Sequence, residues 1–231
     1  MNNTTSTTPV KIWDLPTRVF HWTLVLGMGF MWLSAELGGL WMDWHMKAGV
    51  FMLALIIFRI IWGFVGSETD RFTAFIKSPA TALHHVKELK EGGTAYYAGH
   101  NPLGAWMVVF LLGGVLIQAI SGLFASDDIL VEGPLYGLVA ESTSKAMTGF
   151  HHFWFNILLL AAVVHIFTVG FYKIRKRTNL IKAMVSGSAD WPVDQQPIPN
   201  HLSFKSPWLA LSIFIVCYGL VYFGLQWASK L

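Results

Sequence analysis

The chain of 231 residues is 54% hydrophobic and only 13% charged, with a formal net charge of +3. This composition excludes an ordinary soluble domain and is typical of a membrane protein with several spans. The basic residues lie between apolar runs, which indicates membrane orientation and no nucleic-acid partner. The single cysteine, Cys217, excludes an internal disulfide, a cysteine-ligated iron–sulfur cluster and covalent haem attachment.

Five apolar runs are long enough to be transmembrane helices. We expect these helices at about residues 18–37, 45–65, 102–124, 149–172 and 207–227. Residues 1–17 are predicted to be a cytoplasmic tail, the segment 66–101 a polar loop with a short surface helix, and residues 173–206 a basic cytoplasmic tail. The predicted fold is an all-α integral membrane protein, with a four-helix bundle over residues 18–172 and a fifth, C-terminal transmembrane helix.

The distribution of Lys and Arg predicts the orientation of the spans. Most of the sixteen lie in the N-terminal segment, in residues 66–101 and in residues 173–206, whereas the connections 38–44 and 125–148 hold only Lys145. Cytoplasmic loops carry the excess of Lys and Arg in membrane proteins. We therefore expect a cytoplasmic N-terminus and, after five spans, a C-terminus on the outer side.

The fourth run, residues 149–172, carries His151, His152 and His165 inside an apolar stretch. Ionisable side chains within a membrane usually face the interior of a bundle and mark function. In a helix, His151 and His165 lie roughly 21 Å apart along the axis and within roughly 40° of each other. His152 points about 140° away from His165, so His151 is its partner on the same face.

The predicted orientation also gives a depth to each histidine of the spans. His21 lies near the cytoplasmic face and His45 near the outer face, while the fourth span places His151 outside and His165 inside. Depth therefore pairs His45 with His151 and His21 with His165, as axial ligands of two stacked haems. Haem is favoured over a bare metal because these spans offer neither the cysteines nor the buried carboxylates of zinc and di-iron sites.

Other residues carry weaker signals. Glycines of the spans would let a flat macrocycle approach the backbone, although they are also ordinary packing residues: Gly27, Gly29, Gly49, Gly113 and Gly114. Four cations are candidates for haem propionates or for snorkelling to headgroups: Arg18, Lys47, Arg59 and Lys145. Of the remaining histidines, His152 is a second candidate for a propionate, and solvent exposure is expected for His84, His85 and His201.

Several segments resemble the bacterial cytochrome b561 family, which includes the b-type cytochrome subunits of Ni,Fe-hydrogenases and is similar to those of respiratory formate dehydrogenases. They are WDLPTRVFHW (13–22), HMKAG (45–49), FRIIWGFVGS (58–67), RFTAF (71–75), GHNPLGAW (99–106), SGLFASD (121–127) and the His-x4-Asn-x8-His spacing of the fourth run. The resemblance covers about residues 11–187. His152, where the family commonly has an acidic residue, and the fifth helix depart from the pattern.

The resemblance implies two b haems in the bacterial inner membrane, with His21, His45, His151 and His165 as ligands. It also implies electron transfer between the quinone pool of a respiratory chain and a periplasmic partner, such as a c-type cytochrome or a hydrogenase. His100 and Asn101 become candidates for a quinone site, although Asn-Pro is also an ordinary helix start.

Two alternatives to an electron-transfer subunit stay open at the level of sequence. One is a stand-alone oxidoreductase that acts on quinone and a small outer substrate. The other is a transporter whose histidines relay protons or bind a cation, which would predict mid-span carboxylates and broken helices.

Overall fold

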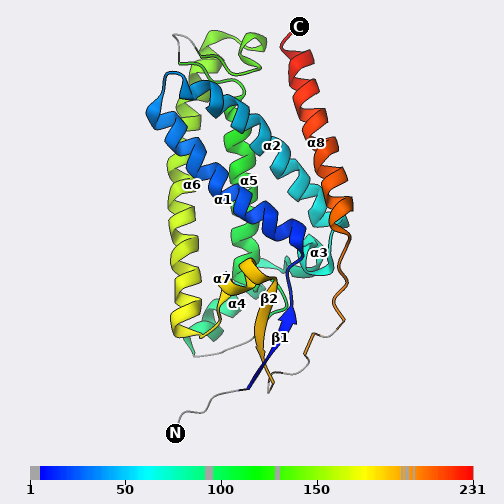
Figure 1. Ribbon diagram of the computed structural model, residues 1–231. Helices are drawn as coiled ribbons and strands as arrows, with labels where there is room; N and C mark the ends of the chain where they lie inside the picture. Colours follow the sequence, from blue (N-terminus) through cyan, green and yellow to red (C-terminus); the bar gives the residue numbers. More distant parts are fainter. Residues whose placement is uncertain are drawn as a thin grey trace. The chain divides into compact units, whose positions relative to one another are not determined.

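The computed structural model describes residues 6–91, 96–127, 131–193, 195, 198–199 and 201–230. Long helices dominate this part of the chain (Figure 1). The elements are β1 (Thr7–Lys11), α1 (Leu15–Leu37), α2 (Trp41–Val65), η1 (Glu68–Asp70), α3 (Phe72–Phe75), α4 (Pro79–Lys90), α5 (Pro102–Gly122), η2 (Tyr136–Leu138), α6 (Glu141–Arg175), α7 (Leu180–Ser186), β2 (Ser188–Pro192) and α8 (Pro207–Ala228).

Within the described residues, four helices are long and apolar enough to cross a membrane: α2, α5, α6 and α8. This confirms the predicted helical, multi-pass membrane class. The first predicted span forms α1, a helix of 23 residues, but α1 is not among the four. Its sequence is less apolar because His21, Thr23 and Glu36 interrupt the run. A membrane crossing by α1 therefore stays a prediction at this point.

The chain divides into two compact units, and the long helices contribute to both. Unit 1 contains Met1–Arg18, Ile61–Phe110 and Val163–Pro207. Unit 2 contains Val19–Ile60, Leu111–Ala162 and Trp208–Leu231.

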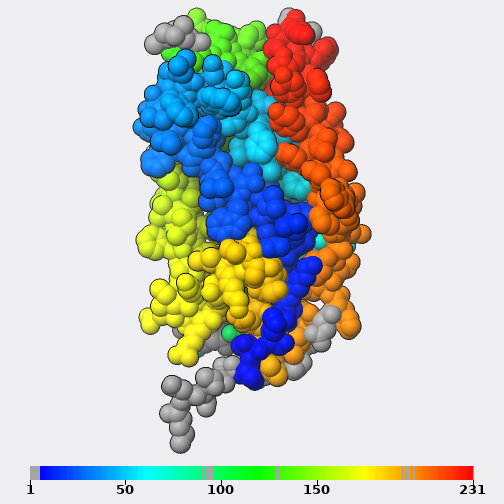
Figure 2. Space-filling model, in the orientation of Figure 1, coloured from blue at the N-terminus to red at the C-terminus, as the bar shows by residue number. Residues whose placement is uncertain are grey.

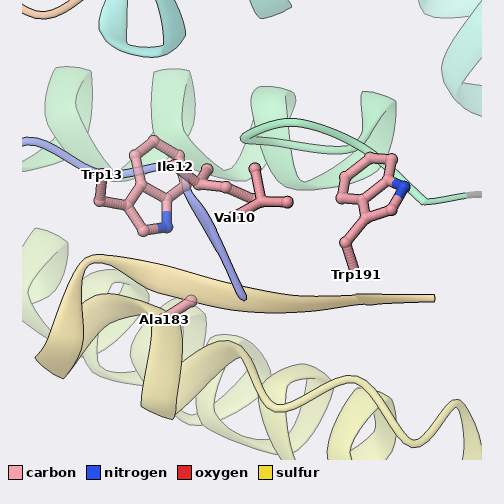
Figure 3. Packing of buried hydrophobic residues seen from close by; sticks show 5 residues of the cluster. All are labelled: Val10, Ile12, Trp13, Ala183 and Trp191. Atoms are coloured by element: carbon pink, nitrogen blue, oxygen red, sulfur yellow. The ribbon is translucent and has the colours of Figure 1, made fainter. Parts of the chain in front are cut away.

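In unit 1, strand β1 pairs antiparallel with β2, with Thr7 opposite Pro192 and Lys11 opposite Ser188. A cluster of buried apolar residues lies beside this sheet (Figure 3): Val10, Ile12, Trp13, Ala183 and Trp191. Residues 7–11 were expected to be part of a solvated tail. A five-residue strand whose partner lies at the other end of the sequence leaves no local signal, so the tail prediction misses it.

Asp14 ties the beginning of α1 to the end of α2 in the same unit. Its carboxylate is buried, at 3% exposure. One oxygen accepts a hydrogen bond from the backbone N–H of Thr17, at 2.7 Å, and so caps the helix. The other accepts from the indole N–H of Trp62, at 3.2 Å, and from the hydroxyl of Ser67. One buried carboxylate thus satisfies three donors.

In unit 2, α8 packs on α2 through aromatic rings. The ring of Phe214 lies 5.7 Å from that of Phe51 and 5.9 Å from that of Phe58, in edge-to-face geometry. Other large apolar side chains of α8 are exposed, such as Trp208 at 75% and Phe223 at 71%. Figure 2 shows this exposed surface of α8 in orange and red. An apolar surface of this extent is typical of a membrane-facing helix.

Candidate functional site

His45 of α2 and His151 of α6 come together in unit 2. Their ring centroids are 6.4 Å apart and their planes make an angle of 74°. A metal–imidazole nitrogen bond is about 2 Å long and the ring centre lies roughly 1 Å beyond the nitrogen, so two imidazoles on opposite sides of one metal have centroids roughly 6 Å apart. The pair therefore already has the separation of two axial ligands of one haem iron.

The Nδ1 atom of His45 is held by α1. It lies 3.0 Å from the carbonyl oxygen of Met31 and 3.2 Å from the hydroxyl oxygen of Ser34. A carbonyl oxygen only accepts hydrogen bonds, so Nδ1 carries the proton in this arrangement. The lone pair is then on Nε2, which is the nitrogen left to bind a metal.

The Nδ1 atom of His151 is held in the same way by α5. It lies 2.9 Å from the carbonyl oxygen of Gln118 and 3.0 Å from the hydroxyl oxygen of Ser121. Each serine follows the carbonyl residue by three positions and donates its own hydroxyl to that carbonyl. The two histidines thus have matching supports, each a carbonyl and a buried serine on a neighbouring helix. Neither serine was predicted from the sequence.

Glycines shape the space around this pair. A Cβ atom added at Gly122 would lie 2.9 Å from Cε1 of His151, so the missing side chain lets the ring lie against α5. Of the glycines predicted to admit a macrocycle, Gly29 and Gly113 face open space. The space beside Gly27 and Gly114 is taken by side chains of Met52 and Leu158. The donor set, two facing imidazoles that each have Nδ1 hydrogen-bonded, fits a haem at His45 and His151.

The other two predicted ligands are described in separate units. His21 lies on α1 in unit 2, half-buried, with its ring edge-on to Trp22 at 5.1 Å. His165 lies half-buried on α6 in unit 1. Their pairing as ligands of a second haem stays a prediction.

The four candidate cations have different surroundings. Arg18 donates to the carbonyl of Val185 at 2.6 Å, and Lys145 pairs with Glu141 at 2.6 Å. Lys47 lies over the ring of Trp44, with 4.9 Å to its centroid. Arg59 is 3% exposed and its guanidinium lies 5.9 Å from the centroid of the Phe20 ring. Of the four, Arg59 is the buried one, where a haem propionate would be a favourable partner.

The two candidates for a quinone site differ in their contacts. The ring of His100 lies between two aromatic rings, with centroids 4.7 Å from Trp13 and 4.6 Å from Phe75. Asn101 has two polar partners. Its side-chain oxygen accepts from the backbone N–H of Gly104 at 2.7 Å, and its amide nitrogen donates to the hydroxyl of Tyr172 at 2.9 Å. Asn101 therefore caps α5 and also orders a phenol of α6.

The prediction that His85 is solvated is wrong, whereas His84 and His201 are exposed as expected. His152, the second candidate for a propionate, is also exposed. His85 is 3% exposed. Its Nε2 lies 3.2 Å from the hydroxyl of Tyr172 and its Nδ1 lies 3.3 Å from the hydroxyl of Tyr97. On α4, His85 follows the buried Ala82 by three residues and shares its face. That spacing was the available signal.

Comparison with known proteins agrees with these features. The model of the family described as prokaryotic cytochrome b561 matches residues 12–187. Three similar proteins are each named "Probable Ni/Fe-hydrogenase B-type cytochrome subunit". The one from Rhodobacter capsulatus is 25% identical over 81% of this chain and 84% of its own length. Those from Azotobacter chroococcum mcd 1 and Azotobacter vinelandii are each 26% identical over 78% of this chain and 88% of their own. Since the family model spans most of the sequence and includes the paired histidines, the chain belongs to the prokaryotic cytochrome b561 family.

Proposed function

We propose that this protein is a dihaem b-type cytochrome of the bacterial inner membrane, which transfers electrons between the quinone pool and a periplasmic redox partner. The observation that carries the proposal is the pair His45 and His151, with ring centroids 6.4 Å apart and both Nδ1 atoms hydrogen-bonded. Family membership and the names of the relatives support it, and those names make a hydrogenase the first candidate partner. A c-type cytochrome is the second.

The residues proposed to hold the two haems are the pair His45 and His151 and the pair His21 and His165. When bound, a b haem supplies an iron that gains or loses one electron at a time. The protein's part is to fix the ligand rings. The Nδ1–H of His45 donates to the Met31 carbonyl and the Ser34 hydroxyl oxygen, which orients the ring. Such contacts fix the tautomer and raise the basicity of the binding nitrogen.

His100 and Asn101, together with Tyr172 as a partner of Asn101, are the proposed quinone-binding groups, at the cytoplasmic side of the membrane. An amide N–H and a phenol O–H are the donors that a quinone carbonyl accepts. Tyr172 follows His165 by two turns of α6, which places it roughly 10 Å further along the axis on the same face. A quinone at Asn101 would thus lie close to the proposed inner haem ligand. In the orientation predicted from the distribution of Lys and Arg, the N-terminus is cytoplasmic and the C-terminus periplasmic.

Haem content and reduction by quinol test the proposal. We expect the detergent-purified protein to hold two low-spin b haems per chain, both reduced by added quinol, in a reduced-minus-oxidised spectrum. His151→Ala should lose about one haem, because a ligand that the chain holds with two hydrogen bonds is removed. His84→Ala, at an exposed position, is the control and should keep both. A wild-type protein without haem, or a His151→Ala variant with two haems, contradicts the proposal.

A further inference from the structure

We infer that Glu88, His85 and Tyr172 form a proton-transfer path that connects the quinone site at Asn101 with the cytoplasmic solvent. The inference rests on the proposed function, since it adds the route of the protons to a site already proposed for the quinone. All four residues belong to unit 1. Glu88 and His85 lie on α4, Asn101 lies directly before α5, and Tyr172 lies on α6.

His85 is a buried imidazole with both ring nitrogens engaged. Its Nε2 lies 3.2 Å from the Tyr172 hydroxyl. Its Nδ1 lies 3.3 Å from the Tyr97 hydroxyl and 3.5 Å from a carboxylate oxygen of Glu88. An imidazole has one N–H and one lone pair, and it exchanges these roles when a proton enters on one side and leaves on the other.

The contacts of Asn101 and Glu88 set the direction of the chain of hydrogen bonds. The N–H of Gly104 points at the Asn101 oxygen, which turns the amide N–H group toward the Tyr172 oxygen. Nδ1 of His85 faces the Glu88 carboxylate, which only accepts, so Nδ1 carries the single ring hydrogen. Nε2 of His85 then has the lone pair and accepts from the Tyr172 O–H.

Glu88 brings the path to the surface. Its side chain is 43% exposed, and its other carboxylate oxygen lies 3.3 Å from Nδ1 of the exposed His84. Among the described residues, three groups that can titrate contact His85: Glu88 on α4, Tyr97 after α4 and Tyr172 on α6. The ammonium of Lys176 on α6 lies 3.4 Å from the carbonyl oxygen of Leu89, near the end of α4. Burial, and secondly the charge of Glu88, raise the pKa of Tyr97, so this phenol stays neutral near pH 7.

Quinol oxidation gives two electrons and two protons. In the proposed step a quinol O–H bond breaks, and its proton passes to the Tyr172 oxygen while Tyr172 passes its own proton to Nε2 of His85. Nδ1 of His85 releases its proton to Glu88, from which it goes to solvent. After the hydrogen bonds return to their first direction, the second proton leaves in the same way. The two electrons would be taken up, one at a time, by the haems that the proposed function assigns to the protein. Quinone reduction runs the same path in reverse.

The experiment uses the full-length, haem-loaded protein and compares two reductants. A soluble ubiquinol analogue must release protons, whereas dithionite reduces haem without using the path. We expect His85→Gln to slow haem reduction by ubiquinol about 100-fold, the scale of general acid–base catalysis, with the dithionite rate and haem content unchanged. The pH dependence of the ubiquinol rate between about pH 5 and 9 should flatten, and added imidazole should restore part of the rate. His201→Gln, at an exposed histidine that is not part of the path, is the matched control.

Glu88→Gln is the second variant, because its half-exposed side chain can change without disturbing the fold. We expect a smaller loss, about tenfold, with a solvent deuterium isotope effect at least as large as that of the wild type, because proton release from His85 then limits the rate more strongly. Glu91→Gln, exposed at the end of the same helix, is its control. If His85→Gln loses haem, the Glu88 pair decides alone.

The outcomes separate the inference from the function on which it rests. Wild-type ubiquinol rates and an unchanged pH profile in His85→Gln, or in Glu88→Gln where it decides alone, overturn the proton path and leave the quinone site standing. A wild-type protein that holds haem but is not reduced by ubiquinol overturns both.

Discussion

At the scale of single residues, the candidate haem site depends on small groups placed against histidine rings. Ser34 and Ser121 each support an Nδ1 atom, and Gly122 leaves room for the ring of His151. Hydrogen bonds made by the nitrogen of a ligand histidine that does not bind the metal fix the orientation of the ring. Their loss typically lowers metal affinity on the order of 10- to 100-fold. The site should therefore respond to changes that leave all four histidines in place.

Gly122→Ala tests the space beside His151. The added Cβ would lie 2.9 Å from Cε1 of the ring, closer than side-chain atoms normally approach, so the ring must shift from its ligand position. We expect about tenfold weaker haem binding at the outer site, measured by haem titration of the purified protein. Gly149→Ala on α6, where nothing lies within 4 Å, is the control and should bind haem normally. Equal haem affinity in both variants would contradict this account.

The sequence predicted the candidate ligands better than it predicted their surroundings. The pairing of His45 with His151 follows from the depth of each residue in its span, and the structure places these two rings together. Ser34 and Ser121 were missed because a serine in an apolar helix looks the same whether or not a ring lies beside it. The prediction of a solvated His85 is wrong because a surface helix has an inner face even within a polar segment.

At the scale of elements, Asp14 shows how the helices of unit 1 are joined. Its carboxylate caps α1 and accepts hydrogen bonds from Trp62 and Ser67. Polar groups that lose their partner in a buried place cost about 1–3 kcal/mol each. Asp14 therefore contributes to the stability of the protein mainly by accepting hydrogen bonds from these three donors.

We expect Asp14→Ala to lower the free energy of unfolding by about 3 kcal/mol or more, because it leaves three donors without their acceptor. Asp190→Ala is the control. It removes an exposed ion pair with Lys182, 2.7 Å long, and should cost less than about 1 kcal/mol. Thermal unfolding in detergent, followed by helical circular dichroism, measures both. An Asp14→Ala protein that melts with the wild type would refute the role given to this carboxylate.

The helices were predictable because each apolar run is long and continuous, and α8 begins at the predicted residue, Pro207. The ends of the helices were less predictable. Helix α6 extends from Glu141 to Arg175, beyond the apolar run at both ends. Polar helical turns outside the apolar stretch carry no hydropathy signal. The β1 and β2 pair was missed for a different reason, since only the folded chain brings the two segments together.

At the scale of the whole molecule, the strand pair requires an even number of membrane crossings between β1 and β2. β1 and β2 are hydrogen-bonded to each other, so they lie on the same side, and the chain between them must cross an even number of times. Between the strands lie three of the four candidate spans, α2, α5 and α6. The helices α3 and α4 are too short to span a bilayer. If these three helices all cross, an even number of crossings requires α1 to cross as well.

This count predicts that the C-terminus, after α8, lies on the side opposite to the N-terminus. Alkaline phosphatase fused to the C-terminus should be active in the periplasm, and green fluorescent protein fused there should stay dark. Fusions after residue 206, before α8, should give the reverse and serve as controls. Fluorescence from the full-length fusion would mean that α1 does not cross and that the strand pair does not form in the cell.

The same strand pair has a consequence for biosynthesis. Lys11 leaves the ribosome early, whereas Ser188 follows only after α1, α2, α5 and α6 have been made. At about 5–20 residues per second, β1 waits roughly 10–35 s for its partner. During that time its unpaired edge and the apolar side chains of Val10, Ile12 and Trp13 are uncovered. In a chain that stops before Ser188, the edge of β1 and these apolar side chains stay uncovered. Proteases can recognise such a chain and degrade it before it competes for haem.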